Sequence, residues 1–204
     1  MKSVITAESL KKRFANTMAL NDLNIEVPEG SIYAFLGPNG AGKTTTIKTL
    51  VNIYAPTSGK AAVLGVDSQK LTPDVFRKIG YVSENQEMPE WMQVDAFLNY
   101  CRSMYPNWNQ DFYQKLIKQF DLPLTERIKS LSRGTKMKVA LVSALAYQPH
   151  LLILDEPFSG LDPLARKEFI NGVLEITENE HWTIFVSSHD IDEVELLANW
   201  VGVI

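Results

Sequence analysis

Short apolar runs alternate with amphipathic stretches along most of the chain. The runs are too short for helices. They predict buried strands at residues 31–36, 151–154 and 183–187, and a fourth strand at residues 201–204. The amphipathic stretches carry apolar residues at helical spacing, which predicts helices at residues 44–52, 163–178 and 190–197. Because strands and helices alternate in this order, we expect an α/β fold with a mainly parallel sheet.

The N-terminal part follows a different pattern. Residues 4–27 contain short alternating pieces, in which Leu23, Ile25 and Val27 fall on one face. A period of two is typical of strands with one buried side. This pattern predicts an N-terminal antiparallel β region that precedes the first buried strand.

The middle of the chain, about residues 87–148, contains no convincing strand. Its apolar positions form two helical faces, one at Phe112, Leu116 and Phe120 and the other at Val139, Val142 and Ala146. We interpret this part as a helical subdomain inserted into the α/β core. Residues 1–204 are then a single domain with a core at 1–86 and 149–204. Because Ile204 falls inside an apolar run, we expect a C-terminal portion beyond it.

Composition narrows the class of protein. The 204 residues include 20 basic and 24 acidic side chains, a net charge of −4, which argues against a non-specific nucleic-acid binder. The single cysteine, Cys101, cannot form an internal disulfide, which favours a reducing compartment. No apolar run approaches the roughly 18 residues that a membrane span needs. We therefore expect a cytoplasmic protein, or one that touches a membrane only through a partner.

The strongest chemical signal is a glycine-rich loop between a predicted strand and a predicted helix. Residues 37–44 read Gly-Pro-Asn-Gly-Ala-Gly-Lys-Thr and match the phosphate-loop pattern G-x-x-x-x-G-K-[ST]. The glycines let backbone N–H groups point at phosphate oxygens, and the helix adds its positive N-terminal end. Lys43 can reach the β- and γ-phosphates, and the Thr44 hydroxyl can bind Mg²⁺. The α/β core is therefore predicted to be that of a P-loop NTPase.

Two acidic residues complete this prediction. Asp155 directly follows a buried strand, where its carboxylate can hold Mg²⁺ through water. Glu156 comes next and is our candidate general base, because a carboxylate beside the γ-phosphate can orient and polarise the attacking water. Together with the loop, they predict binding of a magnesium nucleotide and phosphoryl transfer.

With these motifs in place, the chain resembles the ATP-binding cassette (ABC) family, the nucleotide-binding domains of ABC transporters, over nearly its whole length. The resemblance implies that ATP and Mg²⁺ are the ligands. It assigns Phe14 to stacking on adenine and His189 to contact with the γ-phosphate. The residues implied to hold the phosphates are Gly37, Pro38, Asn39, Gly40, Ala41, Gly42, Lys43, Thr44 and Thr45.

The family's signature segment implies a dimer. Leu131 to Thr135 read Leu-Ser-Arg-Gly-Thr where the family usually has Leu-Ser-Gly-Gly-Gln. The resemblance implies that Ser132 and Gly134 face ATP bound to a second ATPase domain, so that two domains enclose two nucleotides. Ser132 is also expected to cap the helix that follows it. Arg133 replaces a glycine, and it either adds a cation near the phosphate or points to solvent.

A second departure concerns the metal site. After the strand at residues 79–82, the family's glutamine is replaced by Glu84, which can still bind Mg²⁺, and Gln86 is a nearby rival. In both departures the chain resembles the ATPase subunits of bacterial exporters of the antibiotic-resistance and peptide-export type.

The leading hypothesis is that the protein is the ATPase subunit of a transporter. It would be attached to the inner face of the membrane by a separate permease and would have no nucleic-acid partner. The apolar cluster around Trp91 and Met92 is either a groove for a permease helix or part of its own subdomain. A soluble ABC ATPase acting on ribosomes or DNA is the alternative. A P-loop kinase would explain Lys43 and Asp155 but has no use for the signature segment or His189.

Overall fold

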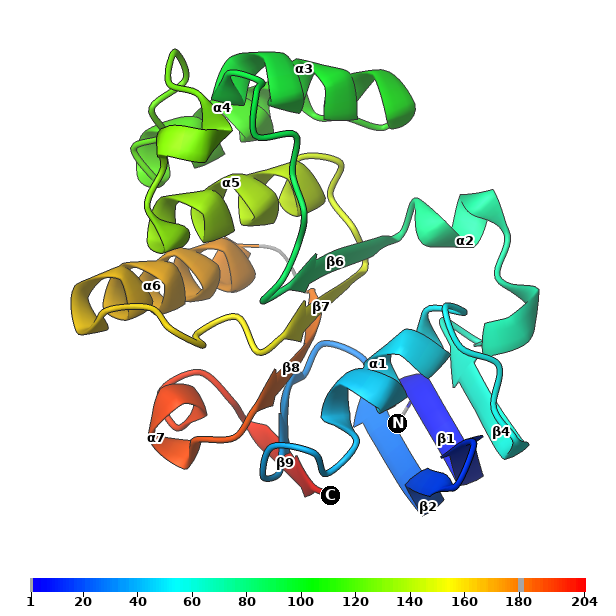
Figure 1. Cartoon of the computed structure of the whole chain (residues 1–204). Helices are drawn as coiled ribbons and strands as arrows, with labels where there is room; N and C mark the ends of the chain where they lie inside the picture. Colours follow the sequence, from blue (N-terminus) through cyan, green and yellow to red (C-terminus); the bar gives the residue numbers. More distant parts are fainter. Residues whose placement is uncertain (1, 180–181) are drawn as a thin grey trace.

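The computed structural model describes residues 2–179 and 182–204, which form two sheets with helices around them (Figure 1). The larger sheet has the strand order β6-β7-β8-β3-β9, and its paired strands are parallel. Its members are β3 (Ile32–Leu36), β6 (Ile79–Ser83), β7 (Leu151–Asp155), β8 (Thr183–Ser188) and β9 (Trp200–Val203). The predicted α/β fold with a parallel sheet is confirmed.

The smaller sheet is antiparallel and has the order β2-β1-β4-β5. Its strands are β1 (Ser3–Phe14), β2 (Thr17–Pro28), β4 (Ser58–Val63) and β5 (Val66–Asp67). The hairpin β1–β2 forms the antiparallel region predicted at the N-terminus. The sequence pattern did not predict β4 or β5.

Tertiary pairing accounts for β4. The strand is rich in Gly, Lys and Ala, which are weak strand formers, and it forms by pairing with β1. The pairing shifts register between Glu8 and Lys11. At this irregularity Ser9 has a φ of 46°, and a Cβ on Gly59 would lie 2.2 Å from the Ser9 carbonyl oxygen. Only glycine lets the two backbones approach so closely.

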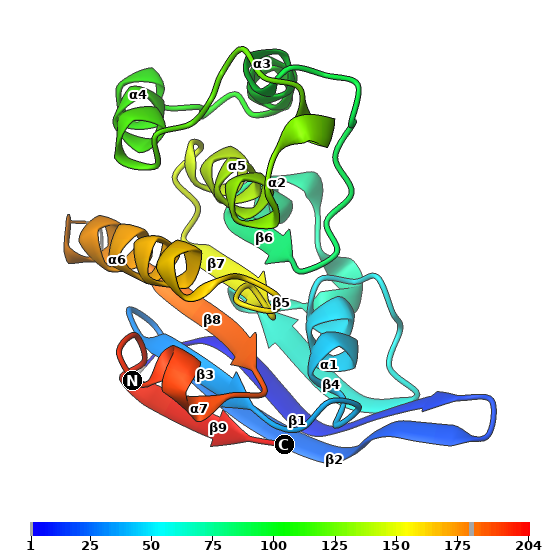
Figure 2. The same ribbon diagram turned by 60° about the vertical axis from the view of Figure 1, so that its left-hand side comes forward.

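Helix α1 (Lys43–Leu50) packs between the two sheets (Figure 2). Its buried Ile47 and Leu50 share an apolar cluster with Ile5 and Val63 of the antiparallel sheet and with Phe185 of β8. Helix α1 is thereby held against both sheets. Two short helices, η1 (Ser68–Lys70) and α2 (Pro73–Phe76), then lead into β6.

The helical insertion lies above β6 in Figures 1 and 2. It consists of α3 (Val94–Met104), α4 (Gln110–Gln119), η2 (Ile128–Ser130) and α5 (Arg133–Leu145). Helix α5 packs directly on β6, since a Cβ on Gly80 would lie 2.9 Å from the Ala144 carbonyl oxygen. The predicted helical insertion is confirmed, although α3 was not foreseen.

Helix α6 (Pro163–Asn179) runs beside α5 (Figure 1). The last helix, α7 (Ile191–Val194), is shorter than the predicted 190–197, so that boundary was wrong. The N–H groups of Leu197 and Ala198 both bond to the Val194 carbonyl, and Asn199 then donates to Ile32. These bonds turn the chain into β9 before a longer helix can form. Among the helices in the described residues, none is long and apolar enough to cross a membrane.

Phe169→Ala tests how α6 is held on the sheet. Phe169 is 1% exposed and meets Phe158 edge-on, with ring centroids 5.7 Å apart. We expect the free energy of unfolding to fall by about 3–5 kcal/mol, measured by denaturant titration, because the lost ring leaves a cavity. Leu164→Ala is the control, because Leu164 lies on the same helix but is 66% exposed. Equal losses in the two variants would contradict the packing of α6 on the sheet.

Candidate functional site

The glycine-rich loop curls between β3 and α1 in a shape that only glycine adopts easily. Gly40 has a φ of 85° and Gly42 a φ of 110°. A Cβ on Gly42 would lie 2.6 Å from the Ala19 carbonyl oxygen of β2, so the loop also packs against the N-terminal hairpin. The loop ends where the N-terminal N–H groups of α1 favour an anion.

Lys43 is buried inside this loop and is 5% exposed. Its ammonium group donates to the carbonyl oxygens of Gly37 and Pro38. Its Nζ also lies 3.0 Å from Glu156 Oε1, which makes an ion pair. Within the part of the chain that the structure describes, this buried oxygen has no hydrogen-bond partner. A phosphate placed in the loop can therefore compete for a cation that is already in position.

Asp155 ends β7 beside two hydroxyl groups. Its Oδ1 accepts hydrogen bonds from Thr44 Oγ1 at 3.1 Å and from Ser187 Oγ at 2.9 Å. Burial raises the pKa of Asp155 above its usual value, although both hydroxyl groups act in the opposite direction. These contacts bring the predicted metal ligands Thr44 and Asp155 together.

The donor set around Asp155 fits Mg²⁺. A cavity of about 120 Å³ is lined by Thr44, Glu84, Asp155 and Glu156, among others. Hydroxyl and carboxylate oxygens are the ligands that Mg²⁺ prefers, and the ion usually takes one or two carboxylates and completes its shell with water and phosphates. Within residues 2–179 and 182–204, no group of three or more His, Cys, Asp or Glu side chains is arranged to hold a metal.

Glu156 sits in a strained position at the centre of the site. Its φ is 51°, a left-handed conformation uncommon for a non-glycine residue, and its N–H donates to Ser187 Oγ at 3.0 Å. His189 Nδ1 lies 2.9 Å from Glu156 Oε2. The bond to Glu156 raises the pKa of His189, with a smaller opposing effect of burial and further support from the charges of Glu156 and Glu193. The Glu156 carboxylate thus lies between the cation of Lys43 and the ring of His189.

Glu84, rather than Gln86, lines the cavity beside Asp155. The Glu84 N–H donates to the Asp155 carbonyl at 2.9 Å, whereas the Gln86 side chain turns back to the N–H of Ser83 at 3.4 Å. Glu84 Oε1 accepts from Ser159 Oγ and from Arg133 Nη2, each at 2.7 Å. Partial burial acts to raise the pKa of Glu84, but these hydrogen bonds and the Arg133 charge prevail and hold it below its usual value. Arg133 is therefore paired within the chain.

Ser132 and Gly134 lie where α5 begins. Ser132 Oγ accepts from the Thr135 N–H at 3.1 Å and caps the helix as expected. A Cβ on Gly134 would lie 2.9 Å from Ala165 Cβ, so α5 and α6 meet closely at this point. Among the described residues, no hydrogen bond joins Ser132 to the phosphate loop of the same chain.

Phe14 lies at the end of β1, in the hairpin that contacts Gly42, and is 39% exposed. The Tyr54 ring packs edge-on against it at 5.1 Å, and Lys12 Nζ lies 4.7 Å from the Phe14 centroid. A half-exposed aromatic face of this kind can stack on a nucleotide base. Sequence reasoning did not find Tyr54 or Lys12.

Sequence reasoning also missed Ser187, whose hydroxyl group joins Asp155 to the backbone of Glu156. Strands β7 and β8 are parallel and place Asp155 opposite Ser187. The carboxyl ends of neighbouring parallel strands gather ligand-binding groups. A polar residue at the end of the next buried strand was therefore the available signal.

Known proteins are similar to this chain in sequence and in fold. A family model described as "ABC transporter" matches residues 20–159. The bacitracin transport ATP-binding protein BcrA of Enterococcus faecalis is 31% identical, and the match covers 100% of this chain and 67% of that protein. The lantibiotic transport ATP-binding protein SrtF of Streptococcus pyogenes is 33% identical, with coverage of 98% and 86%. The solved structure of cbiO1 from Clostridium perfringens, described as part of the ABC transporter complex cbiONQ, has a TM-score of 0.83 at 26% identity, with coverage of 100% and 85%.

Ser187→Ala tests the hydroxyl bridge. We expect the free energy of unfolding to fall by about 1–3 kcal/mol, because the buried N–H of Glu156 loses its acceptor and Asp155 loses a donor. Denaturant titration without nucleotide measures the change. Ser103→Ala removes an exposed hydroxyl bonded only to the Tyr100 carbonyl and serves as the control. If Ser187→Ala costs no more than the control, the bridge does not stabilise the site.

Proposed function

The chain belongs to the ABC transporter ATP-binding family, and from that membership we propose that it hydrolyses ATP with Mg²⁺ to drive a separate membrane permease. One observation carries this proposal. The phosphate loop places Lys43 and Thr44 directly beside the consecutive carboxylates Asp155 and Glu156. Phosphate binding, metal binding and activation of water are thereby available at one point.

Each part of the site has a proposed role in binding. The backbone of residues 37–45 holds the phosphates, and Lys43 neutralises their charge. Thr44 would bind Mg²⁺, Asp155 would hold it through water, and Glu84 would be a further ligand. When bound, the ion withdraws charge from the phosphate oxygens and orients them. Phe14 stacks on the adenine.

Hydrolysis requires a water molecule in line with the γ-phosphate. We assign Glu156 to accept a proton from that water. The water oxygen then bonds to the γ-phosphorus, while the bond between the γ-phosphorus and the oxygen of ADP breaks. His189 contacts the γ-phosphate and stabilises its developing charge. The contacts of Glu156 with Lys43 and His189 support this assignment, because the groups that must meet the phosphate already surround the base.

Ser132 and Gly134 are proposed to act across a dimer interface. We expect them to face the γ-phosphate bound to a second ATPase domain, identical or related. ATP binding would then stabilise the dimer and hydrolysis would release it. The N-terminal end of α5 supports this role, because the N–H groups at a helix start favour an anion.

A groove of about 530 Å³ is the proposed docking site for the permease. It lies between α3 and the region of α2 and β6, and its lining includes Ile53, Phe76, Tyr81, Tyr100 and Met104. Several of these are large exposed apolar side chains, which suit a partner helix. Neither Trp91 nor Met92 is among its lining residues; Met92 packs on the core, and Trp91 is 71% exposed elsewhere.

The cellular setting is proposed on the same basis. Residues 1–204 would form one ABC ATPase domain at the inner face of the cell membrane, attached through the permease and without a nucleic-acid partner. Export is the proposed direction, supported by relatives named for bacitracin and lantibiotic transport. The alternative is a soluble ABC ATPase that acts on ribosomes or DNA.

Glu156→Gln tests the hydrolytic mechanism. We expect kcat to fall by about 10²–10⁴-fold because the amide cannot accept the proton. ATP binding should be retained, and size-exclusion chromatography with ATP should reveal a stable dimer. Glu168→Gln, at an exposed position on α6, is the control and should hydrolyse ATP at the normal rate. Full-rate hydrolysis by Glu156→Gln would remove Glu156 from its role as base.

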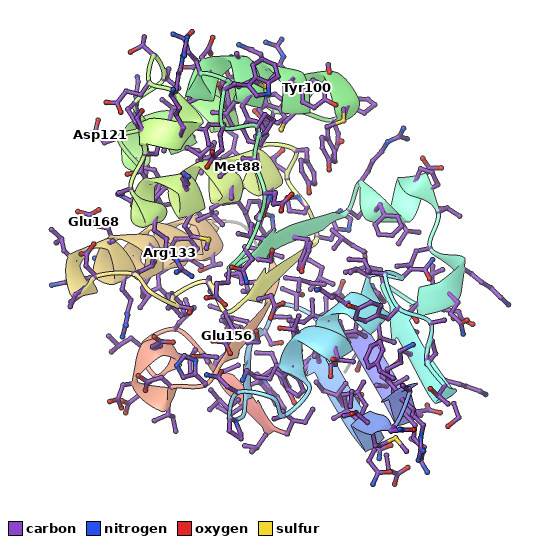
Figure 3. All side chains as sticks on the ribbon, in the orientation of Figure 1. Met88, Tyr100, Asp121, Arg133, Glu156 and Glu168 are labelled. Atoms are coloured by element: carbon purple, nitrogen blue, oxygen red, sulfur yellow. The ribbon has the colours of Figure 1, made fainter. Side chains whose placement is uncertain are left out.

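Tyr100→Glu tests the docking groove. Tyr100 is 53% exposed on α3, where Figure 3 labels it. We expect the charge to abolish co-purification of a polytopic membrane protein from gently solubilised membranes, with ATP binding unchanged. Trp91→Glu is the matched control, because Trp91 is exposed outside the groove. Recovery of ribosomal or DNA-associated proteins with the unmodified chain, and of no membrane protein, would favour the soluble alternative.

A further inference from the structure

Two residues that depart from the family pattern contact each other. Glu84 replaces a glutamine after β6, and Arg133 replaces a glycine at the start of α5. They are 49 positions apart in sequence, yet Arg133 Nη2 lies 2.7 Å from Glu84 Oε1. Figure 3 labels Arg133, the first residue of α5, and Glu156.

A third segment, the loop that follows Glu156, completes the contact. Ser159 Oγ donates to the same Glu84 oxygen at 2.7 Å. The next residue is Gly160, and a Cβ there would lie 2.6 Å from Arg133 Nη1 and 2.9 Å from Arg133 Cζ. The guanidinium therefore rests against bare backbone, and a side chain at Gly160 would displace it. Ser159 and Gly160 therefore fix the position of the ion pair.

Charge explains why these two residues occur together. Glu84 lines the metal cavity with Asp155 and Glu156, and a bound nucleotide adds further negative charge there. A glutamine in place of Glu84 would be neutral, so the glutamate adds one unit of repulsion. Arg133 supplies the opposite charge at hydrogen-bond distance. The Arg133 side chain is 46% exposed and that of Glu84 is 31% exposed. Because water screens the attraction between such charges, the ion pair adds little to stability. Its main effects are on the orientation of Glu84 and on the local charge.

The geometry also leaves part of Glu84 available. Both donors bond to Oε1, and Oε2 has no hydrogen-bond partner among the described residues. The Glu84 backbone is fixed by its N–H bond to the Asp155 carbonyl. The carboxylate is therefore held by one oxygen while the other remains free to accept from a metal-bound group.

We propose that Arg133 is a positioning residue that neutralises and orients Glu84 for the metal site, so that Arg133 and Glu84 act as a matched pair. This inference rests on the proposed function, because it assumes that Glu84 serves magnesium and ATP. The pair also joins the start of α5, which carries Ser132 and Gly134, to the metal side of the nucleotide site.

A double-mutant cycle tests the pair. The variants are Arg133→Ala, Glu84→Gln and the double variant, each in a Glu156→Gln background so that bound ATP is not hydrolysed. Mn²⁺ is the probe, and its affinity in the presence of ATP is measured by electron paramagnetic resonance. Arg133→Ala should weaken Mn²⁺ binding by about tenfold or more, as loss of a residue that orients a metal ligand does. The double variant should regain most of that loss, because a neutral glutamine in place of Glu84 needs no cation.

The controls separate this effect from general damage. Lys136→Ala removes another ion pair of α5, with Glu90, and should leave Mn²⁺ affinity unchanged. ATP binding without metal should be similar in all variants. Arg133→Gln keeps much of the side chain without its charge and decides the outcome if Arg133→Ala does not fold. Arg133→Lys, which keeps the charge, should restore part of the affinity.

The outcomes distinguish the two proposals. If the losses in Arg133→Ala and Glu84→Gln simply multiply in the double variant, Arg133 and Glu84 are not a matched pair and the inference is overturned. Loss of ATP binding in every variant to the same extent would also overturn it. If the unmodified chain does not hydrolyse ATP at all, the proposed function fails, whatever the cycle shows about the pair.

Discussion

The site depends on the parallel register of β6, β7 and β8. Hydrogen bonding between these strands places Ser83 opposite Asp155 and Asp155 opposite Ser187, so the residues that follow each strand meet at one edge. Glu84, Glu156 and His189 all come directly after these strand ends. A register shift of one residue would turn these side chains to the other face of the sheet. The chemistry is therefore a consequence of strand pairing in a buried sheet.

Ionic and hydrogen-bonding contacts within the chain hold this edge together. The Glu156 carboxylate lies within 3.0 Å of Lys43 Nζ and 2.9 Å of His189 Nδ1. Lys43 and Glu156 are both almost fully buried, and buried charges need partners. Lys43 and His189 are also the groups that lie where a triphosphate would bind. ATP binding can thus replace the contacts of Lys43 and His189 with Glu156 by contacts with phosphate oxygens.

The helical insertion connects this site to the apolar groove. Its helix α5 begins at Arg133, which touches the metal side of the site through Glu84, and packs along β6. Its helix α3 forms one wall of the apolar groove. The insertion therefore contacts the nucleotide site at one end and the proposed permease site at another. Coupling between two sites is carried by packed elements that contact both.

The sequence alone determined the features that depend on neighbouring residues. Apolar runs predicted the buried strands, because burial on both faces leaves no polar positions, and the loop at residues 37–44 was evident because its backbone shape follows from its own glycines. Tertiary structure decided which distant residues meet. Hydropathy indicates that a residue is buried but not what it contacts. Strand register and helix packing therefore decided three features: the contact of Arg133 with Glu84, the hydroxyl bridge made by Ser187 and the strand β4.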